Sequence, residues 1–525
     1  MTGIDSVKKE FGDYQTPVSF AEEVCLLLKS KTDFVPDLIL EPTCGVGNFL
    51  RAAAEYYPGV SMIGVDINSS SLERAAASLR GLPVRLIHEN VFDFDFASDF
   101  ASLKDGAGRI LVLGNPPWVT NSGLSQLMGT NCPRKSNFKG LRGFEAITGK
   151  SNFDICEYII LDMLHQLKSK EVLLGMLCKT SVAYTVIQYL YNSGAIPLSF
   201  VEVVHFDAKE VFGVAVDACL LILMLDAQMR WEGTFKRSFM GGQTLRCSDS
   251  RCSESESLSA GFREGRFYTD LRIYDAGIDG DSCVEWRQGL KHDCAKVFEL
   301  TLEEGGLKNG WGEVVSIEPE LVYPLMKSSH VKRYVPGQPF ETYVLVTQRS
   351  IGEPTDRIAC CAPRAWSYLQ RYAKLIGSRK SSIYKGSPPF SIFGIGAYSF
   401  VPYKVVLSGF YKEPLFRLVH ACKPVMVDDT CYFIGFDNFD DAYVAECLLN
   451  SSEVRNFLRG IVDLSAKRPY SKKILGRIDF GKLTERLDYG TLKGQERSEQ
   501  GAVLTEGMYH SFCEKYCRRD FVLNF

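Results

Sequence analysis

Residues 38–50 read L-I-L-E-P-T-C-G-V-G-N-F-L, and this stretch decides the fold of the first part of the chain. The apolar residues Leu38 to Leu40 predict a short buried strand, and the residues from Asn48 onward are typical of a helix. Between them, Gly45 and Gly47 let the backbone turn sharply and approach a ligand closely. A strand, a glycine turn and a helix form the repeating unit of nucleotide-binding α/β domains.

The neighbouring segments continue this alternation: we expect helices over 18–29 and 70–79 and strands over 62–65 and 84–88. Asp66 closes the second strand, 19 residues after Gly47, a distance at which a carboxylate can bind both hydroxyls of a ribose. The turn lacks the Gly-Lys-Ser/Thr of a triphosphate loop and the third glycine of a dinucleotide-binding turn. The pattern therefore favours a ligand that contains adenosine but no phosphates.

A second motif, L-V-L-G-N-P-P-W, occupies residues 111–118. Its apolar part predicts a buried strand, which places Asn115, Pro116, Pro117 and Trp118 at the strand's carboxyl end, where open α/β sheets carry their chemistry. The prolines fix two φ angles, so their carbonyl oxygens are held rigidly. The Asn115 amide oxygen and the Pro116 carbonyl can each accept one hydrogen of an NH2 group, and Trp118 can stack on the attached ring. The alternative is a tight turn that ends in a core tryptophan.

Further along, the pattern predicts a helix over 153–167, a strand over 172–177 and a closing strand pair over 198–204 and 216–225. Phe212 lies on the connection within that pair. Residues after Trp118, to about Lys150, are rich in Gly, Ser and Asn and are typical of a functional loop. We therefore predict three parts: an α/β catalytic domain over 1–230, a junction over 231–300 and a mixed α+β domain over 301–525.

Composition narrows the class of protein. With 525 residues, the chain is long enough for two domains, and 46% hydrophobic and 23% charged residues are typical of a globular protein. The 17 cysteines form no CxxC pair and no Cys/His cluster with zinc spacing, so we expect reduced thiols and no metal. The first ten residues hold no signal-like apolar segment, and the longest apolar run, Ala218 to Leu225, is too short to span a bilayer. These features predict a soluble cytoplasmic protein.

Two segments of the second domain are rich in basic residues. From Arg364 to Lys423 the chain is strongly basic and aromatic, with Glu413 as its one acid, which indicates a surface for a polyanion. Residues 467–473, K-R-P-Y-S-K-K, are a second candidate, although a solvated basic loop has the same composition. From these segments we predict the following DNA-binding residues: Arg379, Lys380, Lys385, Lys472 and Lys473.

Taken in order, the motifs resemble those of the gamma class of DNA adenine-N6 methyltransferases, the modification enzymes of type II restriction systems. The matching segments are Y-Q-T-P (14–17), L-E-P-T-C-G-V-G-N-F (40–49), G-V-D-I-N (64–68), E-N-V-F (89–92) and G-N-P-P-W (114–118). The resemblance implies a class I (Rossmann-like) methyltransferase sheet, S-adenosylmethionine as cofactor, double-stranded DNA as substrate and a C-terminal target-recognition domain. It also implies a cognate restriction endonuclease as a partner.

The resemblance assigns roles to single residues. It implies catalytic roles for Asn115, Pro116, Pro117 and Trp118, stacking of a flipped base on Trp118 and Phe212, and cofactor contacts from Thr16, Glu41, Cys44, Gly45, Gly47, Asp66, Ile67, Asn90 and Asn115. Asn90 departs from the family, which commonly has an acid there, but an amide can still contact the adenine N6 of the cofactor. Structural alternatives remain: a strand-end cap for Asp66, a helix cap or ion pair for Glu41, a helix start for Thr16 and a core position for Phe212.

Other functions are compatible with parts of this pattern. Methyltransferases of a protein glutamine amide or of an RNA base amine also use Asn-Pro-Pro-aromatic tetrads, but they rarely need a long basic and aromatic C-terminal part. A catalytically idle DNA-binding protein on the same scaffold would not need the intact tetrad at Asn115. A fused restriction enzyme is disfavoured because no convincing PD…(D/E)xK arrangement is present. The sequence leaves open cytosine-N4 methylation, the recognised DNA site and the oligomeric state.

Overall fold

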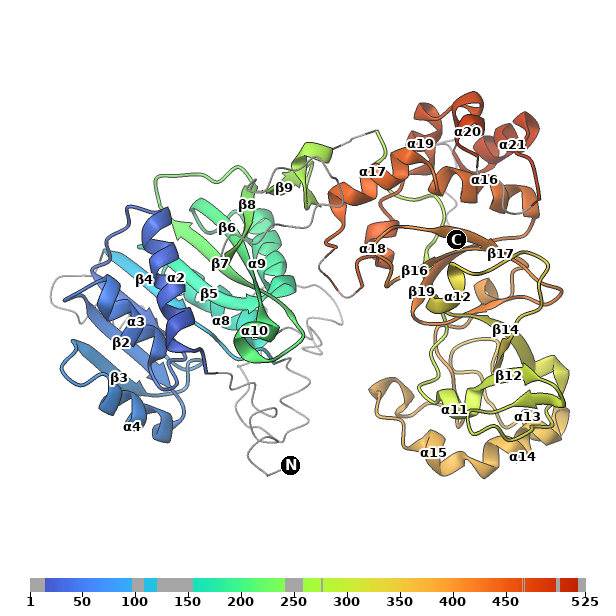
Figure 1. Ribbon diagram of the computed structural model, residues 1–525, viewed down its shortest axis with the longest axis horizontal. Helices are drawn as coiled ribbons and strands as arrows, with labels where there is room; N and C mark the ends of the chain where they lie inside the picture. Colours follow the sequence, from blue (N-terminus) through green and yellow to red (C-terminus); the bar gives the residue numbers. More distant parts are fainter. Residues whose placement is uncertain are drawn as a thin grey trace. The chain divides into compact units, whose positions relative to one another are not determined.

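The computed structural model describes residues 15–96, 108–119, 154–240, 258–274, 277–464, 466, 468–496 and 501–517. It divides into two compact units, Met1–Leu271 and Arg272–Phe525, which are shown in Figure 1. Tyr14 and the predicted loop up to Lys150 lie outside the described residues. Within the described part, none of the helices has both the length and the apolar character that crossing a membrane requires.

The first unit alternates helices and strands around one sheet. Its elements are α2 (Val18–Lys31), β1 (Leu38–Glu41), α3 (Asn48–Tyr56), β2 (Ser61–Asp66), α4 (Ser69–Ser78), β3 (Val84–His88), β4 (Arg109–Gly114), α8 (Ile155–Gln166), β5 (Glu171–Lys179), α9 (Thr180–Ser193), β6 (Leu198–Asp207), α10 (Ala208–Phe212), β7 (Asp217–Leu225), β8 (Thr234–Phe239), β9 (Leu258–Arg263) and β10 (Arg266–Tyr268).

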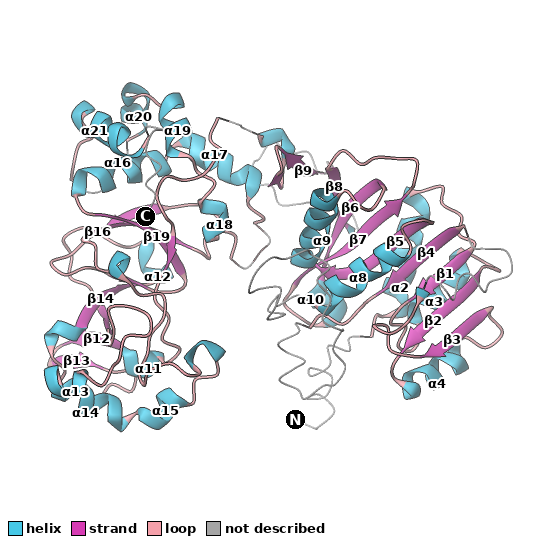
Figure 2. Cartoon of the chain, turned by 180° about the vertical axis from the view of Figure 1, so that it is seen from behind, coloured by secondary structure: helices cyan, strands magenta, loops and turns pink. Residues whose placement is uncertain are grey.

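The ten strands lie in the order β10-β9-β8-β6-β7-β5-β4-β1-β2-β3. Strands β1 to β5 pair in parallel, and β7 runs antiparallel to both β5 and β6. Figure 1 shows α2 in front of the sheet, and Figure 2, seen from behind, shows α8 in front of it. Helices therefore cover both faces, which is why β5 and β7 are almost continuously apolar and buried. This is the predicted Rossmann-like sheet.

Strands β8 to β10 extend this sheet beyond the predicted catalytic domain. β8 pairs in parallel with β6, and β9 and β10 follow in antiparallel pairs. The predicted division into 1–230, 231–300 and 301–525 therefore differs from the observed one, which falls after Leu271. Strand β8 has the sequence T-F-K-R-S-F, and one of its buried positions is occupied by the polar Arg237. Its apolar residues therefore do not alternate with polar ones, and the sequence did not indicate a strand.

The second unit is a mixed α+β domain, as predicted. Its two sheets have the orders β11-β19-β16-β17 and β13-β12-β15-β14-β18. Their strands are β11 (Arg287–Gln288), β12 (Glu299–Glu303), β13 (Gly306–Lys308), β14 (Val322–Met326), β15 (Thr342–Leu345), β16 (Tyr403–Ser408), β17 (Phe416–Val419), β18 (Met426–Val427) and β19 (Cys431–Phe436). The helices are α11 (Ala295–Phe298), α12 (Ser328–Val331), α13 (Ile358–Cys361), α14 (Pro363–Arg371), α15 (Ala373–Gly377), α16 (Phe439–Leu449), α17 (Ser452–Ile461), α18 (Lys472–Leu475), α19 (Phe480–Arg486), α20 (Tyr489–Gln495) and α21 (Glu506–Tyr516).

Candidate active site

Three polar side chains lie at the carboxyl edge of the parallel strands of the first unit. Glu41 is the last residue of β1, Asp66 is the last of β2, and Asn115 follows β4 directly. Because β1 pairs with β2 on one side and with β4 on the other, these strands end side by side. Residues that are far apart in the sequence therefore meet at the point where the strand order reverses, which is where such sheets bind ligands.

The glycine turn after β1 is held by Asp66. One carboxylate oxygen accepts a hydrogen bond from the Gly45 N–H at 2.7 Å, and the other accepts one from the Asn68 N–H at 2.8 Å. Gly47 precedes α3 with φ 79°, a left-handed conformation that favours glycine, and a Cβ there would lie 2.8 Å from Leu79 Cδ1. Asp66, which was predicted to bind ribose hydroxyls, thus fixes the glycine turn, and its hydrogen bond from the Asn68 N–H is the strand-end cap of the alternative interpretation.

The segment that precedes α2 packs against the same turn. The Thr16 carbonyl accepts a hydrogen bond from the Asn48 side chain at 2.7 Å, and the Gln15 side chain accepts one from the Val46 N–H at 3.4 Å. Thr16 is buried, and α2 begins after Pro17 without a side-chain cap. The structure thus places Thr16 beside the glycine turn, one residue before the N-cap Pro17 of α2.

Glu41 is a buried carboxyl group with 3% of its surface exposed. Burial raises its pKa well above the usual range, the Leu50 N–H opposes this rise, and the nearby charge of Asp66 adds to it. Its Oε2 atom has no hydrogen-bond partner among the described residues. A buried acid of this kind is stabilised by a ligand that brings a positive charge and N–H donors to it.

The remaining predicted cofactor contacts surround this edge in different ways. Ile67 follows Asp66 and is 51% exposed, so it offers an apolar surface beside the acid. The Asn90 side chain accepts a hydrogen bond from the Phe92 N–H at 3.2 Å, within the turn after β3. Cys44 is a buried thiol whose pKa is raised chiefly by desolvation, so it contributes packing and backbone rather than charge.

The tetrapeptide ends in an aromatic cluster. The Trp118 indole N–H donates to the Leu177 carbonyl at 3.3 Å, and its ring meets Phe212 edge-on, with centroids 5.5 Å apart and planes at 80°. Phe212 also packs against Phe20 and Phe206, so the predicted partner of Trp118 is half-buried against the core. Because Trp118 is only 9% exposed, a planar ligand can stack on it only after a neighbouring side chain moves.

Lys179 is a site neighbour that the sequence analysis did not select. It ends β5, and its ammonium group donates to the Trp118 carbonyl at 2.9 Å. The available signal was a lysine at the end of a buried strand that pairs with the strand of the tetrapeptide. The sequence could not show that the side chain turns toward Trp118.

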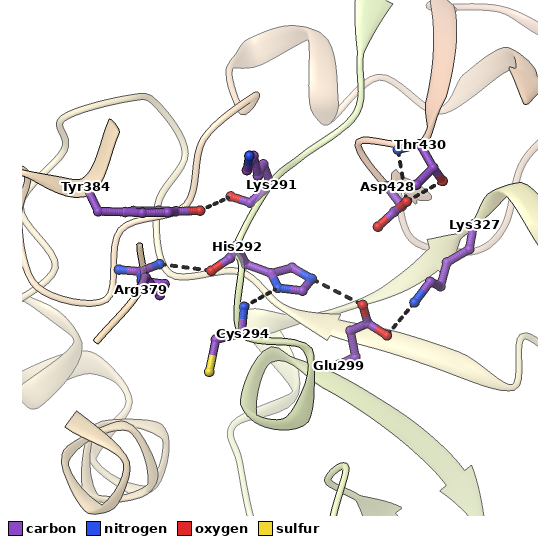
Figure 3. A network of polar contacts seen from close by, with 9 residues as sticks. All are labelled: Lys291, His292, Cys294, Glu299, Lys327, Arg379, Tyr384, Asp428 and Thr430. Carbon is purple, nitrogen blue, oxygen red and sulfur yellow. Dashed lines mark hydrogen bonds and ion pairs between the residues drawn. The ribbon is translucent and has the colours of Figure 1, made fainter. Parts of the chain in front are cut away.

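In the second unit, Arg379 is used inside the structure. Its guanidinium donates to the carbonyls of Ser391 and His292 at 2.7 and 3.1 Å and lies 3.6 Å from the centroid of the Tyr384 ring. Figure 3 shows this arrangement beside the main chain of Lys291 and His292. The geometry thus gives Arg379 an internal role in place of the predicted contact with DNA.

The basic segment from Arg364 to Lys423 does not form one continuous charged face. Lys404 is fully buried, and the Lys423 ammonium donates to the Pro319 carbonyl at 2.6 Å. Lys380 and Lys385 are exposed, and Lys473 is exposed in the other basic segment. Lys472 is exposed as well but pairs with Glu285 at 2.9 Å.

A buried polar network in the second unit has the residue types of a metal site. Ligand atoms of His292, Glu299 and Asp428 lie within 4.8 Å of one another. The Cys294 N–H donates to His292 Nδ1 at 3.2 Å, so the ring hydrogen lies on Nε2, which faces Glu299 at 3.4 Å (Figure 3). A metal would need the Nε2 lone pair, and Lys327 already binds Glu299 at 2.7 Å. The polar contacts of His292, Glu299 and Lys327 are thus made to one another and not to a metal.

Comparison with known proteins shows the family of this chain. Residues 39–103 match the family model of a methyltransferase domain. The type II methyltransferase M.NspV from Nostoc sp. is 38% identical over 485 residues, which cover 91% of this chain and 98% of the relative. The chain belongs to the type II methyltransferases. A shorter match, 30% identical over 116 residues, links this methyltransferase to the type II methyltransferase M.CvrRI of Paramecium bursaria Chlorella virus XZ-6E and covers 22% of this chain and 27% of that protein.

A solved structure shares the fold. The type IIL restriction-modification enzyme MmeI, determined in complex with DNA, matches with a TM-score of 0.51 and 14% identity. The match covers 89% of the methyltransferase described here and 66% of the MmeI chain. At this identity the likeness shows the fold alone, and together with the matched methyltransferase domain it confirms the class I methyltransferase sheet predicted for the first unit.

Proposed function

We propose that this methyltransferase transfers a methyl group from S-adenosylmethionine to the N6 amine of an adenine flipped out of double-stranded DNA. One observation carries the proposal: Asn115 and its two prolines follow β4 at the sheet edge where Glu41 and Asp66 also lie. The amine-binding tetrapeptide and the predicted cofactor site are therefore adjacent.

The residues at this edge fit S-adenosylmethionine. The buried Glu41 carboxyl suits the ammonium group of the methionine part, and Asp66 suits the ribose hydroxyls. The exposed side chain of Ile67 and the amide of Asn90 suit the adenine ring and its amine. When bound, the cofactor supplies an electrophilic methyl group on a sulfonium centre.

The tetrapeptide prepares the amine. The lone pair of the adenine N6 amine is delocalised into the ring, so this amine is a weak nucleophile. Asn115 Oδ1 and the Pro116 carbonyl would each accept one of its hydrogens, which favours a pyramidal nitrogen with its lone pair exposed for in-line attack. Asn115 therefore orients the amine and stabilises developing positive charge, and no strong general base is needed.

Trp118 and Phe212 would hold the flipped base. Extrusion of a base from the duplex costs a few kcal/mol, and stacking on an aromatic side chain returns about 1–3 kcal/mol per contact. The two quantities are similar, so we expect the loss of either ring to weaken flipping rather than abolish it. The two rings already lie next to each other and meet edge-on.

The second unit would supply target recognition. Its exposed Lys380, Lys385 and Lys473 are proposed to contact phosphates, and Lys472 would do so if it left Glu285. The family to which the chain belongs also leads us to propose a cognate restriction endonuclease as its partner and the cytoplasm as its compartment.

The test is Asn115→Ala. Without the amide oxygen the amine loses one of its two acceptors, so methyl transfer should fall by at least about 100-fold while DNA still binds. The measurement is sequencing of methylated positions in a plasmid exposed to protein and S-adenosylmethionine. Asn192→Ala, at an exposed asparagine of α9, is the matched control.

The same experiment separates the alternatives. N6-methyladenine at a recurring short motif would support the proposal, and N4-methylcytosine would change the base but keep the mechanism. A plasmid that stays unmodified by cofactor-loaded wild-type protein would favour a protein or RNA amine. Normal turnover by Asn115→Ala would overturn the assigned role of the tetrapeptide.

A further inference from the structure

The charged side chains of Lys179 and Asp154 hold the C-terminal end of the tetrapeptide. The Lys179 ammonium donates to the Trp118 carbonyl at 2.9 Å and to Asp154 Oδ2 at 2.6 Å. The other Asp154 oxygen accepts the Cys156 N–H at 3.1 Å and so caps the start of α8. One lysine thus joins the end of β5, the start of α8 and the main chain of Trp118.

Each member of the Lys179–Asp154 pair depends on the charge of the other. Asp154 is 8% exposed, and burial raises its pKa, while the hydrogen bond and charge of Lys179 oppose that rise. If Lys179 lost its charge, a buried carboxylate would be left without its cation and the Trp118 carbonyl would lose its donor. Buried groups left in that state are destabilising, so both partners have a strong preference for this geometry.

Strand β5 holds Trp118 at a second point. The indole N–H donates to the carbonyl of Leu177, two residues before Lys179. The following residue is fixed as well, because the Ile155 N–H donates to the Val119 carbonyl at 2.9 Å. The asparagine end of the tetrapeptide is set by β4, whereas its aromatic end is set by β5 and the start of α8.

We propose that Lys179 and Asp154 are positioning residues that set the orientation in which Trp118 receives the flipped base. Neither side chain needs to touch the substrate, because they act through the main chain of Trp118. This inference rests on the proposed function. It predicts that the pair controls base extrusion and turnover and leaves cofactor binding unchanged, since Glu41 and Asp66 belong to other strands.

The test compares Lys179→Met with Lys179→Arg in the full-length protein. The DNA target is first determined by methylation sequencing with the wild type, and 2-aminopurine then replaces the target adenine to report extrusion by fluorescence. We expect Lys179→Met to lower turnover and the fluorescence gain at least tenfold, with the dissociation constant of S-adenosylmethionine changed less than twofold. Lys179→Arg keeps a cationic donor and should recover a large part of both signals. Asp154→Asn keeps the cap of α8 and should also lower turnover and the fluorescence gain.

Two controls separate positioning from general damage. Lys170→Met removes a lysine adjacent to the opposite end of β5 and should behave as wild type. In a Trp118→Ala background, Lys179→Met should have little further effect, because its target ring is gone. Wild-type turnover in Lys179→Met, loss of cofactor binding along with activity, or an undiminished effect in the Trp118→Ala background would each overturn the inference. Failure of the proposed function would appear separately, as an inactive wild type.

Discussion

At the scale of single residues, Glu41 has opposite effects on ligand binding and on stability. Glu41 is buried at the site with a raised pKa, so the folded state is destabilised relative to the unfolded state at pH values above the ordinary range of a glutamate. That cost is acceptable at a site where a ligand supplies a compensating positive charge. The same carboxyl group therefore weakens the empty protein and would strengthen the complex.

Glu41→Gln should separate these two effects. We expect the variant without ligand to unfold at a higher temperature than wild type at pH 7 and to bind S-adenosylmethionine at least tenfold more weakly. The stability gain should disappear as the pH falls below about 4.3, because the glutamate is then protonated in both the folded and unfolded states. Thermal unfolding across pH and calorimetric titration with the cofactor measure both effects. Glu23→Gln, at an exposed position of α2, should change neither, and a destabilised Glu41→Gln would contradict the argument.

Gly47→Ala tests the turn itself. Alanine there would adopt φ near 79° and place its Cβ 2.8 Å from Leu79 Cδ1, so we expect a loss of about 1–3 kcal/mol in the free energy of unfolding and weaker cofactor binding. Gly59→Ala is the matched comparison, since Gly59 has φ 80° but no atom within 4 Å of the added Cβ. Chemical denaturation of both variants isolates the contact with Leu79, and equal losses would assign the whole effect to φ.

The site residues that the sequence could indicate are those fixed by their neighbours in the chain. Glu41 and Asp66 are the last residues of apolar strands and Asn115 follows one directly, so pairing of the strands brings them together. Arg379 and Lys179 differ, because their roles depend on carbonyl groups from distant segments. A count of charges in the sequence cannot distinguish a cation that faces solvent from one that is used inside the fold.

At the scale of elements, strand β16 contains an unusual buried lysine. Lys404 is 1% exposed, and its ammonium donates to the Val401 carbonyl at 2.9 Å. Burial lowers its pKa to about 7. Below pH 7 the lysine is charged in both folded and unfolded states, and the folded state carries the desolvation cost. Between pH 7 and its unfolded pKa of about 10.4, only the unfolded state keeps the proton, so stability rises with pH.

Lys404→Met should therefore stabilise the protein most at pH 6 to 7. One pKa unit corresponds to about 1.4 kcal/mol, which makes the upper limit of the gain about 5 kcal/mol. The advantage should shrink as the pH approaches 10. Denaturation midpoints of variant and wild type at pH 6 and pH 9.5 provide the comparison, with Lys236→Met, at an exposed position of strand β8, as control. A gain that does not depend on pH would show that packing, rather than charge, limits this strand.

The sequence predicted elements well where burial dictated composition. Strands β1 to β7 carry apolar residues because helices cover both faces of that part of the sheet, and β4, β5 and β7 are near-continuous apolar runs. Strands β8 to β10 are shorter or more polar, and the second unit builds its sheets from strands of two to six residues. Such short strands depend on contacts from distant segments, so their sheet order was not accessible from local patterns.

At the scale of the whole molecule, the two units divide the proposed work between chemistry and recognition. Lys380→Glu combined with Lys385→Glu should weaken DNA binding at least tenfold at low salt and reduce the dependence of the affinity on salt, since fewer phosphates are neutralised. Cofactor affinity should not change. Binding curves at several salt concentrations measure this, with Arg80→Glu combined with Lys168→Glu as an equal change of charge on exposed residues of the first unit. An unchanged affinity at low salt would move the DNA-binding surface away from these lysines.

The extension of the first sheet also bears on how the enzyme behaves at high concentration. Without β8, the long apolar strand β6 would end the sheet and offer an open row of backbone groups to another chain. With β8 to β10 added, the described sheet ends in β10, which has three residues, and in β3, which has five. Edges this short are poor templates for adding a foreign strand, so the extension protects the enzyme from aggregation through β-pairing.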